Sequence, residues 1–540
     1  MTGVEALTAT RLPLGCSRIL VADRIAPDGV ERLRAAGEVD VVTGLSREQL
    51  VERIRDYDAL VVRSETKVTA DVLAAGTRLR VVGRAGVGVD NIDIDAATRH
   101  GVLVLNAPTG NTIAAAEHAV ALMCALARNV ARADQSLRAG RWERTAFMGM
   151  ELREKTLGLL GLGKIGFEVA RAASQGLLMR VIAHDPLVTP ERAEQAQVQL
   201  VDLDTLMRES DVLSVHTPLN DSTRGIIGAE QLRVMKPTAR ILNVARGGIV
   251  DEEALATAVR DGWIAGAAVD VFTTEPPPAD HPLLQLPQVL VTPHLGASTH
   301  EAQVNVAFDV ADQIVAVLGG GAARYAVNAP VILPEEMAAL QPYLRLAHQM
   351  GVLAAQLGAV EVREVVCSYA GELAERDTTV LTAEALRGLL AGFTDTRINP
   401  INARAVARQH GIEVSERRST RAVDYANSMA LDVLGGEPLS LAGAQVEGEP
   451  RVTRINGYAV RMRPEGRYLV GTNQDRPGVI AGISSHLARH DINIAGIGLG
   501  RDRPRGRALF LVELDDPVPP EVLVEMQATV GLESVREVNL

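Results

Sequence analysis

Short apolar runs alternate with helical patterns through the first hundred residues of the chain. Apolar runs at 19–22, 59–62 and 79–82 are separated by amphipathic stretches such as 49–55. Runs of this length between helices are typical of strands that are buried on both faces of a parallel sheet. The pattern therefore predicts an α/β domain wound on a parallel sheet.

A second series of the same kind begins after a long helical pattern at 114–137. The apolar run at 157–160 is followed by helical spacing over 164–178 and by another strand-like run at 179–183. Further predicted strands end near Thr217, Val244, Asp270 and Thr292. The series predicts a second doubly wound parallel sheet, and such sheets gather functional groups at the carboxyl ends of their strands.

The pattern changes at a linker over 319–334, which holds a glycine triplet, alanines and two prolines. Residues 335–465 then mix helical patterns at 340–357 and 383–390 with short strands such as 362–369. This mixture predicts an α+β domain, and no catalytic constellation is readable in it.

The last segment alternates short strands and helices. Pro477 suits the first turn of the first helix, where no backbone donor is needed, and Asp475 is expected to cap that helix. The predicted elements are, in order, a strand at 468–472, a helix at 477–489, strands at 492–499 and 508–514, a helix at 521–529 and a closing strand. This βαββαβ order predicts a ferredoxin-like unit.

Composition restricts the classes of partner. The chain has 540 residues, enough for three or four domains, and a net charge of −12 without a basic stripe, which argues against nucleic acid. No apolar stretch reaches the ~18 residues of a membrane span. Residues 1–18 include Glu5 and Arg11 and lack the apolar core of a secretion signal. We therefore expect no membrane partner and a disordered extension over 1–16.

The cysteines indicate the compartment. Cys16, Cys124 and Cys367 are far apart and odd in number, which argues against a disulfide framework and against a metal cluster. A reducing cytoplasmic location without a bound metal is expected.

A glycine loop between a predicted strand and a predicted helix carries the strongest motif. Gly161 permits a tight turn, Gly163 lets backbone N–H groups approach a pyrophosphate at the helix N-terminus, and Gly166 allows close packing of helix and strand. The glycine spacing alone is a weak signal. Its position between strand and helix predicts a dinucleotide site.

Asp185 strengthens that prediction because it follows the next strand, where a carboxylate can bind both ribose hydroxyls. No arginine follows it closely to accept a 2′-phosphate, so NAD is favoured over NADP. The alternative is that Asp185 only caps a turn before Pro186.

Three polar residues come just beyond later strand ends. Oxidation of a 2-hydroxy acid requires a base for the hydroxyl proton, a partner that holds the base, and a cation for the carboxylate and the developing carbonyl. His294, Glu275 and Arg246 match these roles. Each of them alone could be structural, but together behind a dinucleotide loop they indicate hydride transfer.

Over about residues 17–329 these motifs resemble the D-isomer-specific 2-hydroxyacid dehydrogenase family. The resemblance implies that His294 is the base and acid, Glu275 its orienting partner and Arg246 the substrate-polarising cation. It places NAD contacts at Gly161, Gly163 and Gly166, at Arg246 and His294 themselves, and at Val87, Lys164, Ile165, Asp185, Thr217, Val244, Ala245, Asp270, Gly296 and Ala297. Val87 stands where some members have Thr, so a side-chain hydrogen bond is absent there.

The resemblance also indicates a substrate. Arg63, Arg84 and Asn111 match positions that hold 3-phosphoglycerate in the long members of the family. Two guanidinium groups suit a phosphate because their donors fork onto its oxygens. The alternative is that both arginines are solvated surface residues. The implied reaction is oxidation of 3-phosphoglycerate to 3-phosphohydroxypyruvate, which opens serine biosynthesis.

The C-terminal unit is similar to ACT domains, which bind amino acids between paired copies. Asn473, Asp475 and Asn493 match serine-binding positions in related dehydrogenases, although Asn473 departs in residue type. A serine effector and a homotetramer are therefore expected. The implied domains are substrate-binding over 17–112 and 298–329, Rossmann NAD-binding over 113–297, an intervening regulatory or additional substrate-binding domain over 330–466, and ACT over 467–540.

Three other functions remain open at this point. The chain could act by the same chemistry on glyoxylate, hydroxypyruvate or 2-oxoglutarate. It could be an NAD-sensing binding protein of the corepressor type, which has a similar fold. It could also be an amino-acid sensor built on the C-terminal unit, which the intact catalytic set disfavours.

Overall fold

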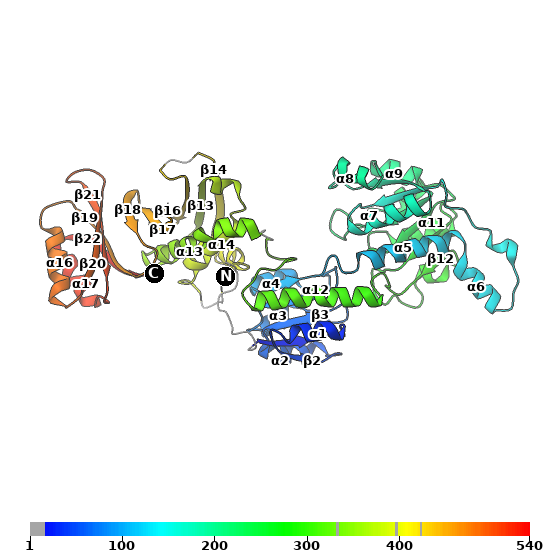
Figure 1. Ribbon diagram of the computed structural model, residues 1–540, viewed down its shortest axis with the longest axis horizontal. Coiled ribbons are helices and arrows are strands. Elements are labelled where there is room, and N and C mark those ends of the chain that lie inside the picture. The colour runs from blue at the N-terminus through cyan, green and yellow to red at the C-terminus, as the bar shows by residue number, and fades with distance from the viewer. Residues whose placement is uncertain (1–16, 331–333, 395–397, 422–423) are drawn as a thin grey trace.

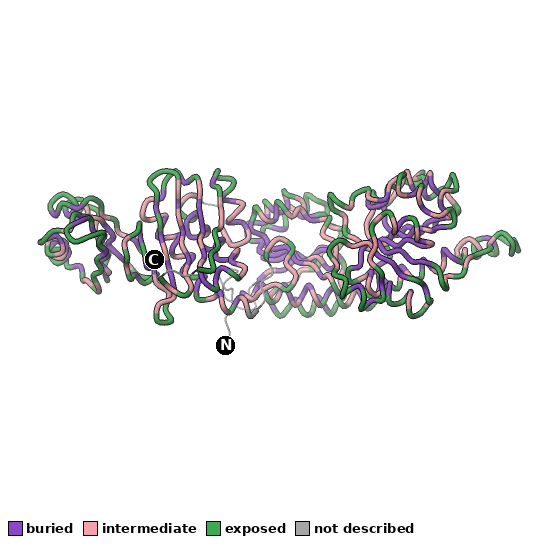
Figure 2. The backbone as a smooth tube through the Cα atoms, turned by 90° about the horizontal axis from the view of Figure 1, so that it is seen from above, coloured by how far each residue is buried: buried purple, intermediate pink, exposed green. Residues whose placement is uncertain are grey.

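The computed structural model describes residues 17–330, 334–394, 398–421 and 424–540. These residues form four sheets that lie in a row along an elongated molecule (Figure 1). Buried residues gather in the interior of each unit, and exposed residues cover its rim (Figure 2). The expected extension over 1–16 lies outside the described residues.

The first sheet is parallel throughout and has the order β2-β1-β3-β4-β5. Its strands are β1 Ser17–Val21, β2 Gly37–Val41, β3 Ala59–Val62, β4 Val81–Arg84 and β5 Leu103–Leu105. Its helices are α1 Pro27–Leu33, α2 Arg47–Arg53 with η1 Ile54–Asp56, α3 Ala70–Ala75, α4 Ile94–Arg99 and α12 His300–Leu318.

Helix α12 returns to this sheet from much later in the chain. Val310 and Ile314 of α12 lie over Gly83 of β4, where a Cβ atom would come within 2.6 Å of both side chains. The same helix residues are buried with the apolar side chains of β1 and β3. Segments far apart in the sequence therefore pack together around the first sheet.

The second sheet is also parallel throughout, with the order β12-β11-β10-β9-β6-β7-β8. Its strands are β6 Thr156–Leu160, β7 Arg180–His184, β8 Gln199–Leu200, β9 Val212–Val215, β10 Arg240–Asn243, β11 Gly266–Val269 and β12 Val289–Val291. The strand order reverses between β6 and β9, and ligands of open α/β sheets bind at such a switch point.

Helices cover both faces of the second sheet. They are α5 Thr112–Ala127, α7 Lys164–Arg171, η3 Ala172–Gly176, α8 Pro190–Gln195, α9 Leu203–Glu209, α10 Ala229–Arg233, α11 Glu252–Arg260 and η4 Pro282–Gln285. Helices α6 Val130–Arg138 and η2 Arg144–Phe147 belong to an arm that projects from this unit (Figure 1).

The single helix expected over 114–137 is wrong. The helix is interrupted between α5 and α6, where Asn129 has φ 55° in the left-handed region.

Among the described residues no single helix has the length and apolar composition of a membrane span. Taken together, α5 and α6 meet that test by length and composition only, and they are bent by 62° at the break.

The third sheet is mixed and has the order β14-β13-β15-β16-β17-β18. Its strands are β13 Glu364–Gly371, β14 Glu413–Ser419, β15 Asn427–Leu434, β16 Leu439–Val446, β17 Glu449–Ile455 and β18 Tyr458–Met462, and its helices are α13 Pro334–Gln356, η5 Glu372–Glu375, α14 Thr379–Leu390 and α15 Ala403–Gln409. Helices α13 and α14 pack closely because Gly351 and Gly388 face backbone oxygens, to which a Cβ atom would be 2.0 and 2.1 Å.

The fourth sheet is antiparallel with the order β20-β21-β19-β22. Its elements are β19 Arg467–Gln474, α16 Val479–Arg489, β20 Ile494–Arg501, β21 Arg507–Leu514, α17 Pro520–Val530 and β22 Leu532–Asn539. The expected βαββαβ order is confirmed.

The expected start and cap of the first helix in this unit are wrong. Helix α16 begins at Val479, two residues after Pro477, and its N-cap is Gly478 with φ 98° and no side-chain cap. Asp475 instead pairs with Arg501 at 3.2 Å and accepts a hydrogen bond from the Arg505 N–H. The carboxylate therefore holds the 501–505 segment rather than the helix.

Candidate active site

The glycine loop has the geometry that a bound dinucleotide requires. Gly161 follows β6 with φ 98°, and a Cβ atom there would lie 2.7 Å from the His216 carbonyl oxygen. Gly163 is the N-cap of α7 and faces open space, whereas a Cβ at Gly166 would lie 2.4 Å from the Gly161 oxygen. The open side at Gly163 leaves the α7 N-terminus accessible to a pyrophosphate.

Asp185 lies beyond the end of β7 and is tied to the glycine loop. Its Oδ2 accepts a hydrogen bond from the Leu162 N–H at 2.8 Å, and its Oδ1 accepts one from the Leu187 N–H at 2.9 Å. The carboxylate stays partly exposed. Its negative charge at this place suits ribose hydroxyls and opposes a 2′-phosphate.

We expect Asp185→Ala to raise the Kd of NADH roughly tenfold or more, the size of one charge-assisted hydrogen bond. Leu187 is 90% exposed beside it, so the double variant Asp185→Ala with Leu187→Arg should gain use of NADPH. Fluorescence titration with each cofactor measures both effects, with Asp204→Ala on the surface of α9 as the control. An unchanged cofactor affinity would show that Asp185 only caps its turn.

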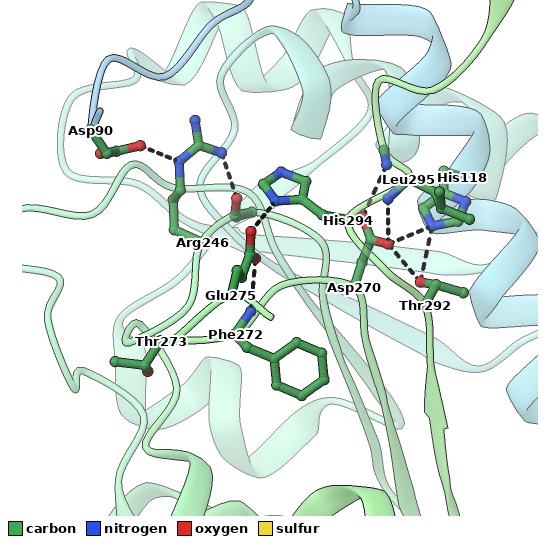
Figure 3. Close-up of polar contacts among 12 residues, drawn as sticks. Asp90, His118, Arg246, Asp270, Phe272, Thr273, Glu275, Thr292, His294 and Leu295 are labelled. Carbon is green, nitrogen blue, oxygen red and sulfur yellow. Dashed lines mark hydrogen bonds and ion pairs between the residues drawn. The ribbon is translucent and has the colours of Figure 1, made fainter. Parts of the chain in front are cut away.

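His294 and Glu275, the predicted base and its orienting partner, are in contact (Figure 3). His294 follows β12 and Glu275 follows β11, and their Nδ1 and Oε2 atoms are 2.8 Å apart. The other oxygen of Glu275 accepts from the Phe272 N–H at 3.0 Å. No described residue hydrogen-bonds Nε2 of His294, which leaves that nitrogen for a substrate proton.

The carboxylate of this pair is ionised at neutral pH. Burial raises the pKa of Glu275, but hydrogen bonds from His294 and from the Phe272 N–H outweigh that effect and hold the pKa below its ordinary value. An ionised Glu275 fixes the ring of His294 through the contact with Nδ1.

Asp270 holds the loop that carries His294. Its side chain is 0% exposed, and its oxygens accept from Thr292 Oγ1 at 2.6 Å, the Leu295 N–H at 2.8 Å and the Gly296 N–H at 3.0 Å. His118 Nε2 of α5 lies 3.2 Å from the same carboxylate. Asp270 is expected to contact NAD. In the structure it lies beside the loop of His294, and both of its carboxylate oxygens accept from protein donors (Figure 3).

The loop needs the support of Asp270 because His294 has φ 54°, in the left-handed region that residues other than Gly rarely adopt. The His294 N–H donates to the Asp270 carbonyl oxygen at 2.8 Å. Asp270 therefore fixes both the backbone of His294 and the residues that follow it.

Arginines from both sheets converge beside the pair. Arg246 follows β10, and Arg84 ends β4 with its Nε buried and without a described partner. Burial, and then the nearby charge of Arg246, lower the pKa of Arg84 to about 10, which leaves it charged at neutral pH. Arg63 also acts electrostatically on Arg84. Such a cluster of cations suits an anionic substrate.

Glycines make room for these guanidinium groups. A Cβ atom at Gly86 would lie 2.0 Å from an NH1 atom of Arg84, and one at Gly88 would lie 1.9 Å from NH2 of Arg246. The spacing Gly-x-Gly at 86–88 was the available signal for this arrangement, because both glycines lie in the loop after β4.

Two residues that were not predicted from the sequence organise the loop of Arg63. Asp23 is 2% exposed and accepts from the Arg63 N–H, the Thr66 N–H and the Thr66 hydroxyl. Asn91 Nδ2 donates to the carbonyl oxygens of Arg63 and Thr66. Asp23 lies just beyond the end of β1. Functional groups of parallel sheets gather at the carboxyl ends of their strands, and this strand-end rule could have identified Asp23 from the sequence.

Comparison with known proteins agrees with this geometry. The family model for the NAD binding domain of D-isomer specific 2-hydroxyacid dehydrogenases matches residues 120–296. The model for the D-3-phosphoglycerate dehydrogenase intervening domain matches 339–456, and the ACT domain model matches 469–530.

Full-length relatives extend the match to nearly the whole chain. The D-3-phosphoglycerate dehydrogenase of Archaeoglobus fulgidus is 45% identical, over 97% of this chain and 100% of that protein. The chain belongs to the D-3-phosphoglycerate dehydrogenase family. The Bacillus subtilis D-3-phosphoglycerate dehydrogenase is 38% identical over 97% of this chain and 99% of its own length.

Solved structures match more than half of this D-3-phosphoglycerate dehydrogenase family member. The TT0316 protein of Thermus thermophilus is 35% identical with a TM-score of 0.54, over 57% of this chain and 99% of that one. A glyoxylate reductase from Paecilomyes thermophila is 30% identical with a TM-score of 0.53, over 58% and 98%. The predicted enzyme class, an NAD-dependent D-2-hydroxyacid dehydrogenase with an ACT domain, is confirmed.

The remaining expected cofactor and substrate contacts lie around the same strand ends of the enzyme. Val87 accepts a hydrogen bond from Asn106 through its carbonyl oxygen, and Asn111 is the N-cap residue of α5 with its Oδ1 buried and without a described partner. The others are Lys164 and Ile165 at the start of α7, Thr217 after β9, Val244 and Ala245 after β10, and Gly296 and Ala297 after β12.

The expected effector residues make their hydrogen bonds to other described residues. Asn493 Nδ2 donates to Asp515, and Asn473 is 2% exposed with its Oδ1 buried and without a described partner. No hydrogen bond between described residues links Asn473, Asp475 and Asn493. The described residues also contain no group of three or more His, Cys, Asp or Glu that could hold a metal ion.

Proposed function

We propose that this dehydrogenase oxidises 3-phosphoglycerate to 3-phosphohydroxypyruvate with NAD, as the first step of serine biosynthesis. The observation that carries the proposal is the group of Arg63, Arg84 and Arg246 beside the His294–Glu275 pair. The full-length relatives are named D-3-phosphoglycerate dehydrogenases, which supports the same substrate.

The site residues divide the chemistry between them. His294 Nε2 takes the proton of the C2 hydroxyl while the hydride leaves C2, and Glu275 stabilises the imidazolium that forms. Arg246 stabilises the charge on the C2 oxygen and the substrate carboxylate. Bound at the glycine loop, NAD supplies the hydride acceptor. Arg63 and Arg84 hold the phosphate in this proposal, because an unphosphorylated acid does not need the two cations beyond Arg246.

Arg84→Gln should lower kcat/KM for 3-phosphoglycerate by roughly 10- to 100-fold, which corresponds to a charge-assisted hydrogen bond of about 1.5–3 kcal/mol. The loss for unphosphorylated glycerate should be much smaller. NADH formation from the two acids measures the difference, and the exposed Arg34→Gln serves as the control. Equal losses for both acids would contradict a phosphate role for Arg84.

The same assay separates the competing functions. Turnover of glyoxylate, hydroxypyruvate or 2-oxoglutarate in preference to the phosphorylated acid would select the alternative substrates. Absence of turnover with every acid would favour an NAD-sensing protein of the corepressor type. Repeating the assay with L-serine tests the proposed effector role of Asn473, Asp475 and Asn493.

We also propose that the enzyme is a homotetramer in the cytoplasm with the domain bounds expected above. An arm after α6 exposes Trp142 and Met148 by 77% and 80%. A cavity of about 380 Å³ beside Glu275 and His294 is lined by apolar residues such as Phe272 and Leu284. Exposed apolar side chains and an apolar cavity support self-association, and sedimentation velocity measures the oligomer size.

A further inference from the structure

One ion pair joins the two parallel-sheet domains directly at the active site. Arg246 follows β10 of the second sheet, whereas Asp90 lies in the loop after β4 of the first sheet. The Nε–H of Arg246 donates to Oδ2 of Asp90 at 3.1 Å across this boundary (Figure 3). The side chain of Arg246 is 27% exposed and that of Asp90 is 67% exposed.

The guanidinium of Arg246 is restrained at further points. Its NH1 donates to the Ala245 carbonyl oxygen at 2.7 Å. Its NH2 lies against Gly88, where a Cβ atom would come within 1.9 Å. With Nε held by Asp90, the remaining N–H groups of the fork are left for a substrate carboxylate and carbonyl oxygen.

The backbone around Asp90 is itself fixed. Asn91 donates from its side chain to the Arg63 and Thr66 carbonyl oxygens, and the Val68 N–H donates to the Asn91 carbonyl oxygen. Asp90 therefore presents its carboxylate from a defined position, although the side chain contributes little to the buried core. Its loss should not unfold the loop.

We propose that Asp90 is a positioning residue for Arg246: it orients the guanidinium across the domain boundary for the 2-oxo acid. The inference rests on the proposed dehydrogenase function but not on the phosphorylated substrate, because every 2-oxo acid presents the carboxylate and carbonyl that Arg246 binds. The Asp90–Arg246 ion pair also links the approach of the two domains to the orientation of the Arg246 guanidinium.

The test compares Asp90→Ala and Asp90→Asn in the reduction of 3-phosphohydroxypyruvate and of hydroxypyruvate by NADH. Asp90→Ala should lower kcat roughly 10- to 100-fold, as expected for a displaced orienting group. The loss of kcat should be similar for each substrate. The Kd of NADH should stay within about twofold of the wild-type value, because Asp90 orients Arg246 and not the cofactor. Asp90→Asn should recover part of kcat, since its amide oxygen still accepts from Nε. The neighbouring exposed carboxylate variant Glu65→Ala should behave as wild type.

A double-mutant cycle with Arg246→Lys distinguishes positioning from a general structural effect. Lysine has no Nε–H fork, so Asp90→Ala should lower kcat by less than about threefold in that background, a non-additivity expected of residues that act together. Additive losses, or a wild-type kcat in Asp90→Ala, would overturn the inference. If the wild-type enzyme reduces hydroxypyruvate but not 3-phosphohydroxypyruvate, only the proposed substrate is refuted. If it reduces neither acid, both the proposed function and the role of Asp90 are overturned.

Discussion

His294→Ala should lose roughly 10²- to 10⁴-fold in kcat, the usual contribution of a general acid or base, while it binds NADH as the wild type does. The expected loss follows from the geometry of the pair. The 2.8 Å contact with Glu275 engages Nδ1 and leaves Nε2 for the substrate proton. The glycine loop and Asp185 lie at other strand ends and remain intact in this variant.

Two measurements check this result. Steady-state rates in both directions give kcat, and titration of NADH fluorescence gives the cofactor Kd. His300→Ala is a matched control, because His300 is an exposed histidine six residues further on, at the start of α12. A His294 variant that keeps the wild-type kcat would remove the assignment of the base.

The strand-end rule explains why much of the site could be predicted from the sequence. Arg246, Glu275 and His294 follow β10, β11 and β12, which are neighbours in the second sheet. Parallel strands bring such residues to one edge whatever their separation in sequence. The glycine loop was predictable for a similar reason, since its spacing is dictated by the turn between β6 and α7.

Contacts that depend on how elements approach one another could not be predicted. The pairing of Asp90 with Arg246 exists only because two domains face each other, and hydrophobic periodicity carries no information on that. The break at Asn129 was missed because the apolar spacing continues through it. The crossing of α13 and α14 at Gly351 and Gly388 likewise depends on a pair of glycines far apart in sequence.

Asp270 illustrates a residue whose place, but not whose contacts, followed from the sequence. The strand-end rule put it at the active edge, and the family resemblance assigned it to NAD. Its oxygens accept from Thr292 and from the backbone of Leu295 and Gly296, and the contact with NAD stays a prediction. Burial raises the pKa of Asp270, but hydrogen bonds from His118 and Thr292 bring it below its ordinary value, so it is ionised as this acceptor role requires.

Asp270→Asn should therefore impair both stability and catalysis. An amide turns N–H donors toward the Leu295 or Gly296 N–H, and one buried donor left without an acceptor destabilises a fold by about 1–3 kcal/mol. The left-handed backbone of His294 would then lose support that offsets about 1–3 kcal/mol of strain. We expect a lower Tm together with a fall in kcat, because the loop can no longer hold His294 against Glu275.

Thermal unfolding, kcat and the Kd of NADH, measured on the same preparations, decide between two roles for Asp270. Thr292→Val is the control, since it removes only the hydroxyl that donates to this carboxylate and should show a smaller drop in Tm. A loop-holding role predicts that Tm and kcat fall while the NADH Kd changes little. The opposite result, a weakened NADH affinity with Tm and kcat unchanged, would restore the direct NAD contact, because only a group that touches the cofactor would act on Kd alone.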